Sequence, residues 1–113
     1  MLSFHSLYSH GFIRTAVAIP AIKIANPLFN ARQTIALAQR AAQNKAAIVV
    51  FPELGLSGYS NDDLFQQDVL LEASLQALSK VRQATENLFS VVVVGAPLRV
   101  GQHLFNCAVV LYR

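Results

Sequence analysis

Four apolar runs along the chain predict the strands of a sheet. Three of them are directly followed by a proline, which has no backbone N–H to donate, so each strand ladder is expected to end there. The fourth follows a tight turn and is expected to return antiparallel to the third. The second run contains no polar residue, which is typical of a strand buried on both faces. The predicted strands span residues 13–19, 46–51, 90–96 and 104–112.

A helix is predicted between the first two strands. Asn26 is a suitable N-cap, and Pro27 stands at the first helical position. Asn44 and Lys45 suit the end of this helix, because Asn tolerates a left-handed cap and a cation complements the helix dipole. The residues expected to face the core recur three or four positions apart, as Leu28, Ala31, Ile35, Ala38 and Ala42.

A second helical stretch is expected from Asn61 to about residue 87, with a break near Asp68. Asp62 and Asp63 would lie in its first turn, near the positive end of the helix dipole. The order of strand, helix, strand, helix, strand and strand predicts an α/β sheet with helices on one or both faces. The part of this helical stretch after Asp68 is expected to bury Leu71, Leu75, Leu78 and Val81.

The composition narrows the class of protein. Of 113 residues, 54% are hydrophobic and 13% are charged, whereas about 25% charged residues is typical of a soluble domain. These few charges cannot cover every face, so one face is expected to pack against a partner or against the rest of its own domain. No apolar run is long enough to span a membrane, and residues 1–12 read as an irregular arm rather than a secretory signal, so a cytoplasmic protein is expected.

The charges are unevenly placed. The formal net charge is +3, but the nine basic residues are scattered singly, which argues against a nucleic-acid partner. Residues 1–52 contain no acidic residue. A local negative field is therefore expected around one window, which holds Glu53, Asp62, Asp63, Asp68 and Glu72.

Glu53 is the main candidate for chemistry. It follows the second apolar run and Pro52, so it is expected at the carboxyl edge of a strand, where open α/β sheets bind ligands. Gly55 and Gly58 would let the backbone approach a ligand closely. The residues alone leave two interpretations of Glu53 open, a general base or acid and an ordinary solvated or helix-capping carboxylate. Tyr59 either lines a substrate pocket or packs on its neighbours.

The cysteine and the histidines are not predicted to form a reactive site. Cys107 lies in an apolar strand with no His or Lys at a spacing that would activate it, so a core position is predicted. The three histidines are isolated, which argues against a metal site. The chain has neither a phosphate-binding loop nor a dinucleotide motif.

Several segments occur in a recognisable order. They are residues 8–14 (YSHGFIR), 51–59 (FPELGLSGY) continued by 62–68 (DDLFQQD), 94–99 (VGAPLR) and 105–110 (FNCAVV). Together they resemble the nitrilase, or carbon-nitrogen hydrolase, superfamily, and more narrowly the N-terminal glutaminase domains of glutamine-dependent NAD synthetases. The resemblance implies a nitrilase-like α-β-β-α sandwich, of which residues 1–113 would form the N-terminal part, with the synthetase domain absent.

The resemblance also implies a reaction. The family hydrolyses amides with a Glu-Lys-Cys triad, in which Cys is the nucleophile, Glu the general base and Lys the stabiliser of the tetrahedral intermediate. Glu53 matches the Glu position, whereas the Lys and Cys positions are expected beyond Arg113, so the fragment alone is expected to be inactive. The complete protein would hydrolyse glutamine and pass ammonia to a synthetase domain that converts deamido-NAD to NAD with ATP and Mg²⁺, and it would form a homo-oligomer.

Two alternatives stay open. One is a stand-alone amidase or nitrilase of the same superfamily. The other is a non-catalytic, truncated interaction module that binds another chain through its uncovered apolar face.

Overall fold

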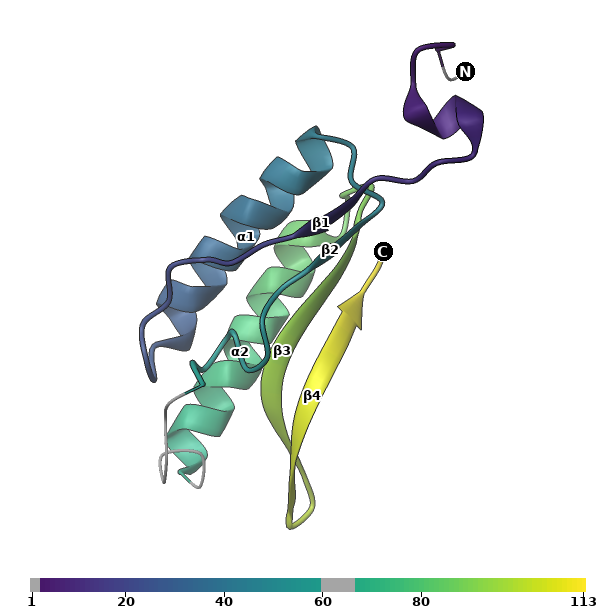
Figure 1. Cartoon of the computed structure of the whole chain (residues 1–113). Coiled ribbons are helices and arrows are strands. Elements are labelled where there is room, and N and C mark those ends of the chain that lie inside the picture. The colour runs from purple at the N-terminus through teal and green to yellow at the C-terminus, as the bar shows by residue number, and fades with distance from the viewer. Residues whose placement is uncertain (1–2, 60–66) are drawn as a thin grey trace.

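The computed structural model describes residues 3–59 and 67–113. Within these ranges β1, β2 and β3 run parallel, and β4 is antiparallel to β3. The predicted α/β order and the antiparallel return of the last strand are confirmed. The four strands lie side by side in chain order (Figure 1), as β1 (Thr15–Val17), β2 (Ile48–Val50), β3 (Val91–Val100) and β4 (His103–Leu111).

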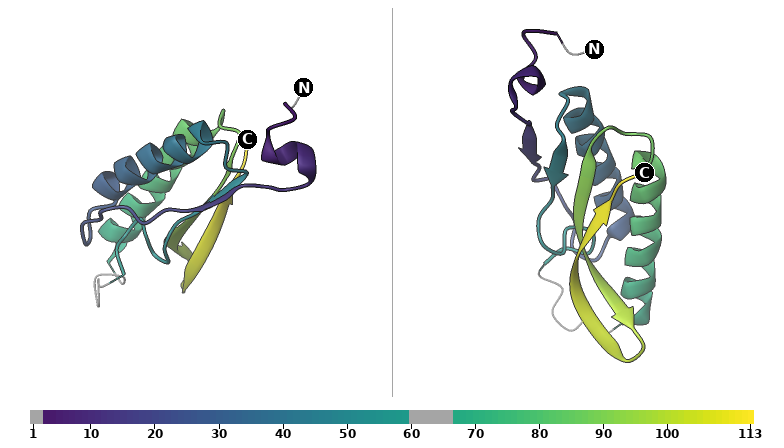
Figure 2. Two further views of the ribbon diagram at one scale, coloured as in Figure 1. Left: turned by 45° about the horizontal axis from the view of Figure 1, so that its top comes forward. Right: turned by 90° about the vertical axis from the view of Figure 1, so that its right-hand side faces the viewer.

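Two helices, α1 (Pro27–Gln43) and α2 (Asp68–Thr85), cover the same face of this sheet (Figure 2). The mixed α/β arrangement is the one expected for the N-terminal portion of a nitrilase-like sandwich. Among the described residues, no helix is long and apolar enough to cross a membrane.

The caps of α1 lie close to the predicted residues. The side-chain oxygen of Asn26 accepts a hydrogen bond from the backbone N–H of Phe29 at 3.2 Å, so Asn26 is the N-cap, as predicted. At the other end the left-handed conformation falls on Lys45, with φ 60°, and not on Asn44. Asn44 instead donates its side-chain amide to the carbonyl of Arg40 at 2.8 Å. A side-chain cap therefore replaces the expected left-handed asparagine.

The helices bury smaller residues than the predicted stripes suggested. Leu28 and Leu75 are 43% and 57% exposed, so their predicted burial is wrong. α1 and α2 pack against each other, and buried residues of both helices join the sheet in one hydrophobic core. Small side chains on the shared face allow a closer approach. α1 buries Pro27, Asn30, Ala31, Thr34, Ala38 and Ala41, and α2 buries Leu70, Leu71, Ser74, Ala77, Val81 and Thr85.

The second predicted helix can be compared with the structure only from residue 67 onward. The described helix begins at Asp68, where a break was expected, and ends at Thr85. The predicted start at Asn61, with Asp62 and Asp63 in the first turn, lies outside the described residues.

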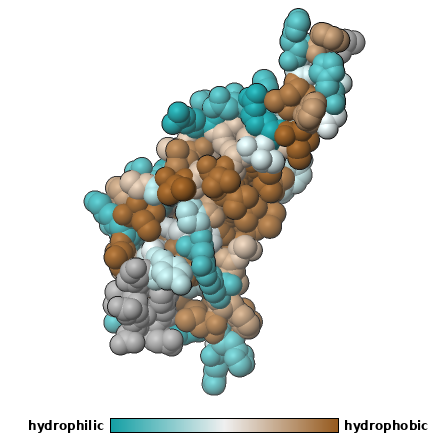
Figure 3. Space-filling model, in the orientation of Figure 1, coloured by the Kyte–Doolittle hydropathy of each residue, from teal (hydrophilic) through white to brown (hydrophobic). Residues whose placement is uncertain are grey.

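The register of the strands separates a covered face from an open face. Val49 and Val92 lie on the covered face and are fully buried, and their neighbours in the row are Ala16 and Leu111. β2 was predicted to be buried on both faces, and this is wrong. Both helices lie on one side of the sheet, and Val50 on the other side is 39% exposed. Hydrophobic residues accordingly gather at the surface over the strands β1 and β2 (Figure 3). The open row consists of Val17, Val50, Val93 and Val110, of which Val17 and Val110 are 80% and 63% exposed.

β3 continues through Pro97, where the strand was predicted to end. The carbonyls of Val93 and Gly95 accept hydrogen bonds from the N–H groups of Phe51 and Leu56 on the β2 side. Backbone groups two residues apart on a strand point to the same side. The nitrogen of Pro97 therefore points past the end of β2 and not toward β4. Its missing N–H costs no ladder hydrogen bond, so the strand continues.

The arm predicted to be irregular contains one short 3-10 helix, η1 (Leu7–His10). Ser6 caps it, because its hydroxyl accepts a hydrogen bond from the N–H of Tyr8 at 3.3 Å. The hydroxyl of Tyr8 in turn donates to the carbonyl of Lys45, just beyond α1. The arm projects from one end of the sheet in both views of Figure 2.

Candidate functional site

The residues after β2 fold into a tight turn that places Glu53 at the carboxyl edge of the parallel strands. The N–H of Gly55 donates to the carbonyl of Pro52 at 3.2 Å, and the N–H of Gly58 donates to the carbonyl of Leu54 at 2.8 Å. Leu54 has φ 52°, a left-handed value that non-glycine residues keep only where the surroundings hold them. The predicted position of Glu53 at the end of the second strand is thus the observed one.

Gly95 of β3 supports this turn. An ideal Cβ on Gly95 would lie 2.4 Å from the nitrogen of Leu54 and 2.6 Å from the carbonyl oxygen of Pro52. The carbonyl of Gly95 also accepts a hydrogen bond from the N–H of Leu56 at 3.1 Å. This close approach of two backbones requires glycine. In the sequence, this close approach is indicated only by a glycine that follows a run of valines, since a glycine within a strand often marks a site where another backbone comes close.

A buried asparagine on α1 holds the turn from the other side. Asn30 is fully buried, and its side-chain amide donates to the carbonyl of Leu56 at 2.9 Å and to that of Lys23 at 2.8 Å. Its side-chain oxygen accepts from the N–H of Lys23 at 2.7 Å. The N–H of Ala25 donates to the carbonyl of Ser57 at 2.9 Å. Sequence reasoning missed Asn30, whose only signal was a polar residue beside the apolar stripe of α1.

The side chain of Glu53 meets a residue of β4. The side-chain amide of Asn106 donates a hydrogen bond to Oε1 of Glu53, across 53 positions of sequence. Both residues are exposed, and Asn106 pairs with Pro97 on the open face of the sheet. Sequence analysis placed Asn106 in a motif but gave it no role. The described site is thus a carboxylate at a strand end with an amide donor beside it.

Cys107 follows Asn106 but faces the other way. It pairs with the fully buried Ala96 on the covered face, and it is half-buried and free. The predicted burial in the core is therefore met only in part, and the sheet separates the thiol from Glu53. The described residues include no group of three or more His, Cys, Asp or Glu side chains that could hold a metal ion.

Residues 14–113 match the carbon-nitrogen hydrolase family. The chain belongs to the carbon-nitrogen hydrolase family. A curated relative, the glutamine-dependent NAD(+) synthetase of Mycobacterium tuberculosis H37Rv, is 42% identical over 112 residues, which are 99% of this chain and 16% of that protein. The corresponding synthetase of Xylella fastidiosa 9a5c is 36% identical over 101 residues, which are 88% of this chain and 18% of that protein. The chain therefore spans less than a fifth of the length of these relatives.

A solved structure shares the fold of this chain. The crystal structure of a glutamine-dependent NAD(+) synthetase from Cytophaga hutchinsonii superposes with a TM-score of 0.81 at 22% identity, covering 88% of this chain and 17% of that one. At this identity the similarity bears on the fold alone. The described sheet and helices thus have the same arrangement as the matching part of that synthetase.

Two other predicted site features have different outcomes. Tyr59, predicted to line the substrate pocket, is 64% exposed at the end of the described turn, and its role stays a prediction. Asp68 of the acidic window forms an ion pair with Arg99 of β3. Asp62 and Asp63 lie outside the described residues.

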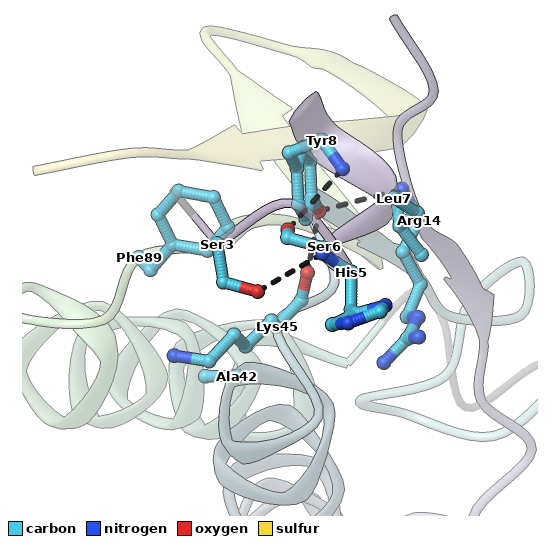
Figure 4. A pocket seen from close by; sticks show the side chains of 9 residues that line it. All are labelled: Ser3, His5, Ser6, Leu7, Tyr8, Arg14, Ala42, Lys45 and Phe89. Carbon is cyan, nitrogen blue, oxygen red and sulfur yellow. Dashed lines mark hydrogen bonds between the residues drawn. The ribbon is translucent and has the colours of Figure 1, made fainter. Parts of the chain in front are cut away.

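A hollow of about 890 Å³ lies at the opposite edge of the sheet, between the N-terminal arm and the end of α1 (Figure 4). Arg14, Lys45 and Phe89, which precede β1, β2 and β3, line it together with residues of the arm. Figure 4 shows the Lys45 ammonium and the Arg14 guanidinium on opposite sides of the His5 ring. These cations do not converge on one point, and Glu53 is not among the lining residues.

Proposed function

We propose that this chain supplies the general base of a glutamine amide hydrolase, and that Glu53 is that base. In the complete protein, the released ammonia serves the ATP-dependent conversion of deamido-NAD to NAD. The observation that carries the proposal is the place of Glu53, a carboxylate at the carboxyl edge of parallel strands in a carbon-nitrogen hydrolase chain that is 42% identical to a glutamine-dependent NAD(+) synthetase over 112 residues.

The chemistry assigns one task to Glu53. A thiol attacks the carbonyl carbon of the amide while a nearby carboxylate accepts the thiol proton. The C–N bond then breaks, and ammonia leaves with that proton. Water cleaves the resulting thioester, which releases the acid and restores the thiol. The thiol and the lysine that stabilises the intermediate belong, in this proposal, to parts of the protein outside residues 1–113. Cys107 is unsuited to the nucleophile's role, because it lies on the opposite face of β4 from Asn106 and Glu53. Residues 1–113 alone are then inactive.

The proposal assigns no ATP or Mg²⁺ site to this chain. Those groups belong to the synthetase part of the complete protein, which supplies the ligation chemistry. Assembly as a homo-oligomer is likewise a property proposed for the complete protein. The described residues contribute the position of Glu53. The turn that carries it packs on Gly95 and is hydrogen-bonded by Asn30.

A graft tests the proposal directly. Residues 1–113 replace the matching segment of the Mycobacterium tuberculosis synthetase, and NAD formation is measured with glutamine and with ammonia as nitrogen donors. Glu53→Gln is expected to lower the glutamine-dependent rate at least about 10³-fold. The ammonia-dependent rate should not change, because it bypasses amide hydrolysis.

The matched control is Glu72→Gln, which makes the same change on an exposed position of α2. It should leave both rates unchanged. Equal loss of both rates in Glu53→Gln would make Glu53 a structural residue, and unchanged glutamine-dependent activity would remove it from the reaction.

A further inference from the structure

We infer that Asn106 is a positioning residue, which orients the Glu53 carboxylate for proton transfer through the hydrogen bond to Oε1. This inference rests on the proposed function of Glu53. The juxtaposition comes from the tertiary fold, since the turn after β2 and the middle of β4 meet on the open face of the sheet.

The sheet register explains why these two side chains meet. The turn packs on Gly95, which pairs with Ala108, and the next pair on the same face is Pro97 with Asn106. Diagonal neighbours on one face of a sheet lie about 7–8 Å apart. A glutamate side chain leaving the turn above Gly95 can span that separation, and Asn106 is the residue placed to receive it.

An amide suits this task better than a cation. Asparagine carries N–H donors without charge, so it can fix a carboxylate without neutralising it. Hydrogen bonds to an ionised acceptor are shorter and stronger than neutral ones. Among the described residues, the one ion pair joins Arg99 to Asp68, and no cation pairs with Glu53. The Glu53 carboxylate therefore keeps its negative charge, which it needs to accept a proton.

The two carboxylate oxygens of Glu53 have different surroundings. The Asn106 amide donates to Oε1, and no described donor reaches Oε2. A general base needs an unoccupied oxygen within reach of the proton that it removes. Because Glu53 is exposed, its side chain would otherwise sample several rotamers, and a base held in one rotamer reacts more often from a productive geometry. Oε2 is therefore the oxygen that accepts the proton.

The test uses the graft described above. Asn106→Leu removes the donor at similar volume and is expected to lower kcat with glutamine about 10–100-fold. KM for glutamine and the ammonia-dependent rate should change less than about 3-fold, because Asn106 acts on Glu53 and not on substrate binding. Asn106→Gln, which keeps an amide donor, should recover part of the loss. The control is Asn87→Leu, the same change at an exposed position between α2 and β3.

A double-mutant cycle separates positioning from a structural role. Glu53→Asp shortens the carboxylate beyond the reach of Asn106, so adding Asn106→Leu to it should cost little more. Additive losses, an equal fall in the ammonia-dependent rate, or an unchanged kcat in Asn106→Leu would overturn the inference while Glu53→Gln still supports the proposed function. A graft that retains ammonia-dependent activity but does not use glutamine, or one in which Glu53→Gln is silent, overturns both.

Discussion

Replacing Gly95 with alanine would add one methyl group at the point where two backbones come closest. Its Cβ would lie 2.4 Å from the nitrogen of Leu54, whereas ordinary contact begins at 3.4 Å. The turn would have to move by about 1 Å, and because the clashing atoms are backbone atoms, no side-chain rotation can relieve the contact. The hydrogen bond from Leu56 to Gly95 would be disturbed by the same movement.

The expected loss of stability follows from these two effects. Overpacking a close contact costs about 1–3 kcal/mol, and a lost backbone hydrogen bond adds about 1 kcal/mol. The free energy of unfolding of Gly95→Ala should therefore fall by about 2–4 kcal/mol, which lowers the urea midpoint of the 113-residue chain by about 1–2 M. The midpoint is measured by the circular dichroism of α1 and α2.

Activity gives a second measurement of the same displacement. In the graft, a 1 Å shift of Glu53 is expected to lower the glutamine-dependent rate about 10²-fold and to spare the ammonia-dependent rate. The control is Ala108→Val, which enlarges the exposed residue paired with Gly95 on the same face and should change stability by less than about 0.5 kcal/mol. If Gly95→Ala matches Ala108→Val in both measurements, the close approach is not a constraint on the site.

Three further substitutions probe how the turn and helices are held, each by urea unfolding of the same chain. Asn30→Leu should cost about 2–4 kcal/mol, because the buried carbonyl of Leu56 and the backbone of the preceding segment lose their partner; a neutral result would contradict the role of Asn30. Asn26→Ala should cost about 1 kcal/mol through the lost N-cap, and no change would mean that the cap is not formed. Asp68→Asn should change stability by less than about 1 kcal/mol, since its pair with Arg99 is exposed; a larger loss would show a stronger interaction.

Local patterns predicted the elements well and their exposure less well. The N-cap at Asn26 and the antiparallel return of β4 were readable because capping and hairpin signals act over a few residues. The predicted end of β3 before Pro97 was wrong. The direction of the Pro97 nitrogen relative to β2 depends on the register of the sheet, which the local sequence does not show. The exposure of Leu75 was likewise set by the packing of α1 against α2.

The sequence by itself determined the order of strands and helices, the family resemblance and the position of Glu53 just after a strand. Those features follow from hydrophobic periodicity, turn residues and short motifs, all of which act locally. Only the tertiary structure decided that both helices cover one face, that Gly95 carries the turn, and that Asn106 reaches Glu53 from 53 residues away. Each of these depends on strand register and on the approach of distant backbones, which no local pattern of residues specifies.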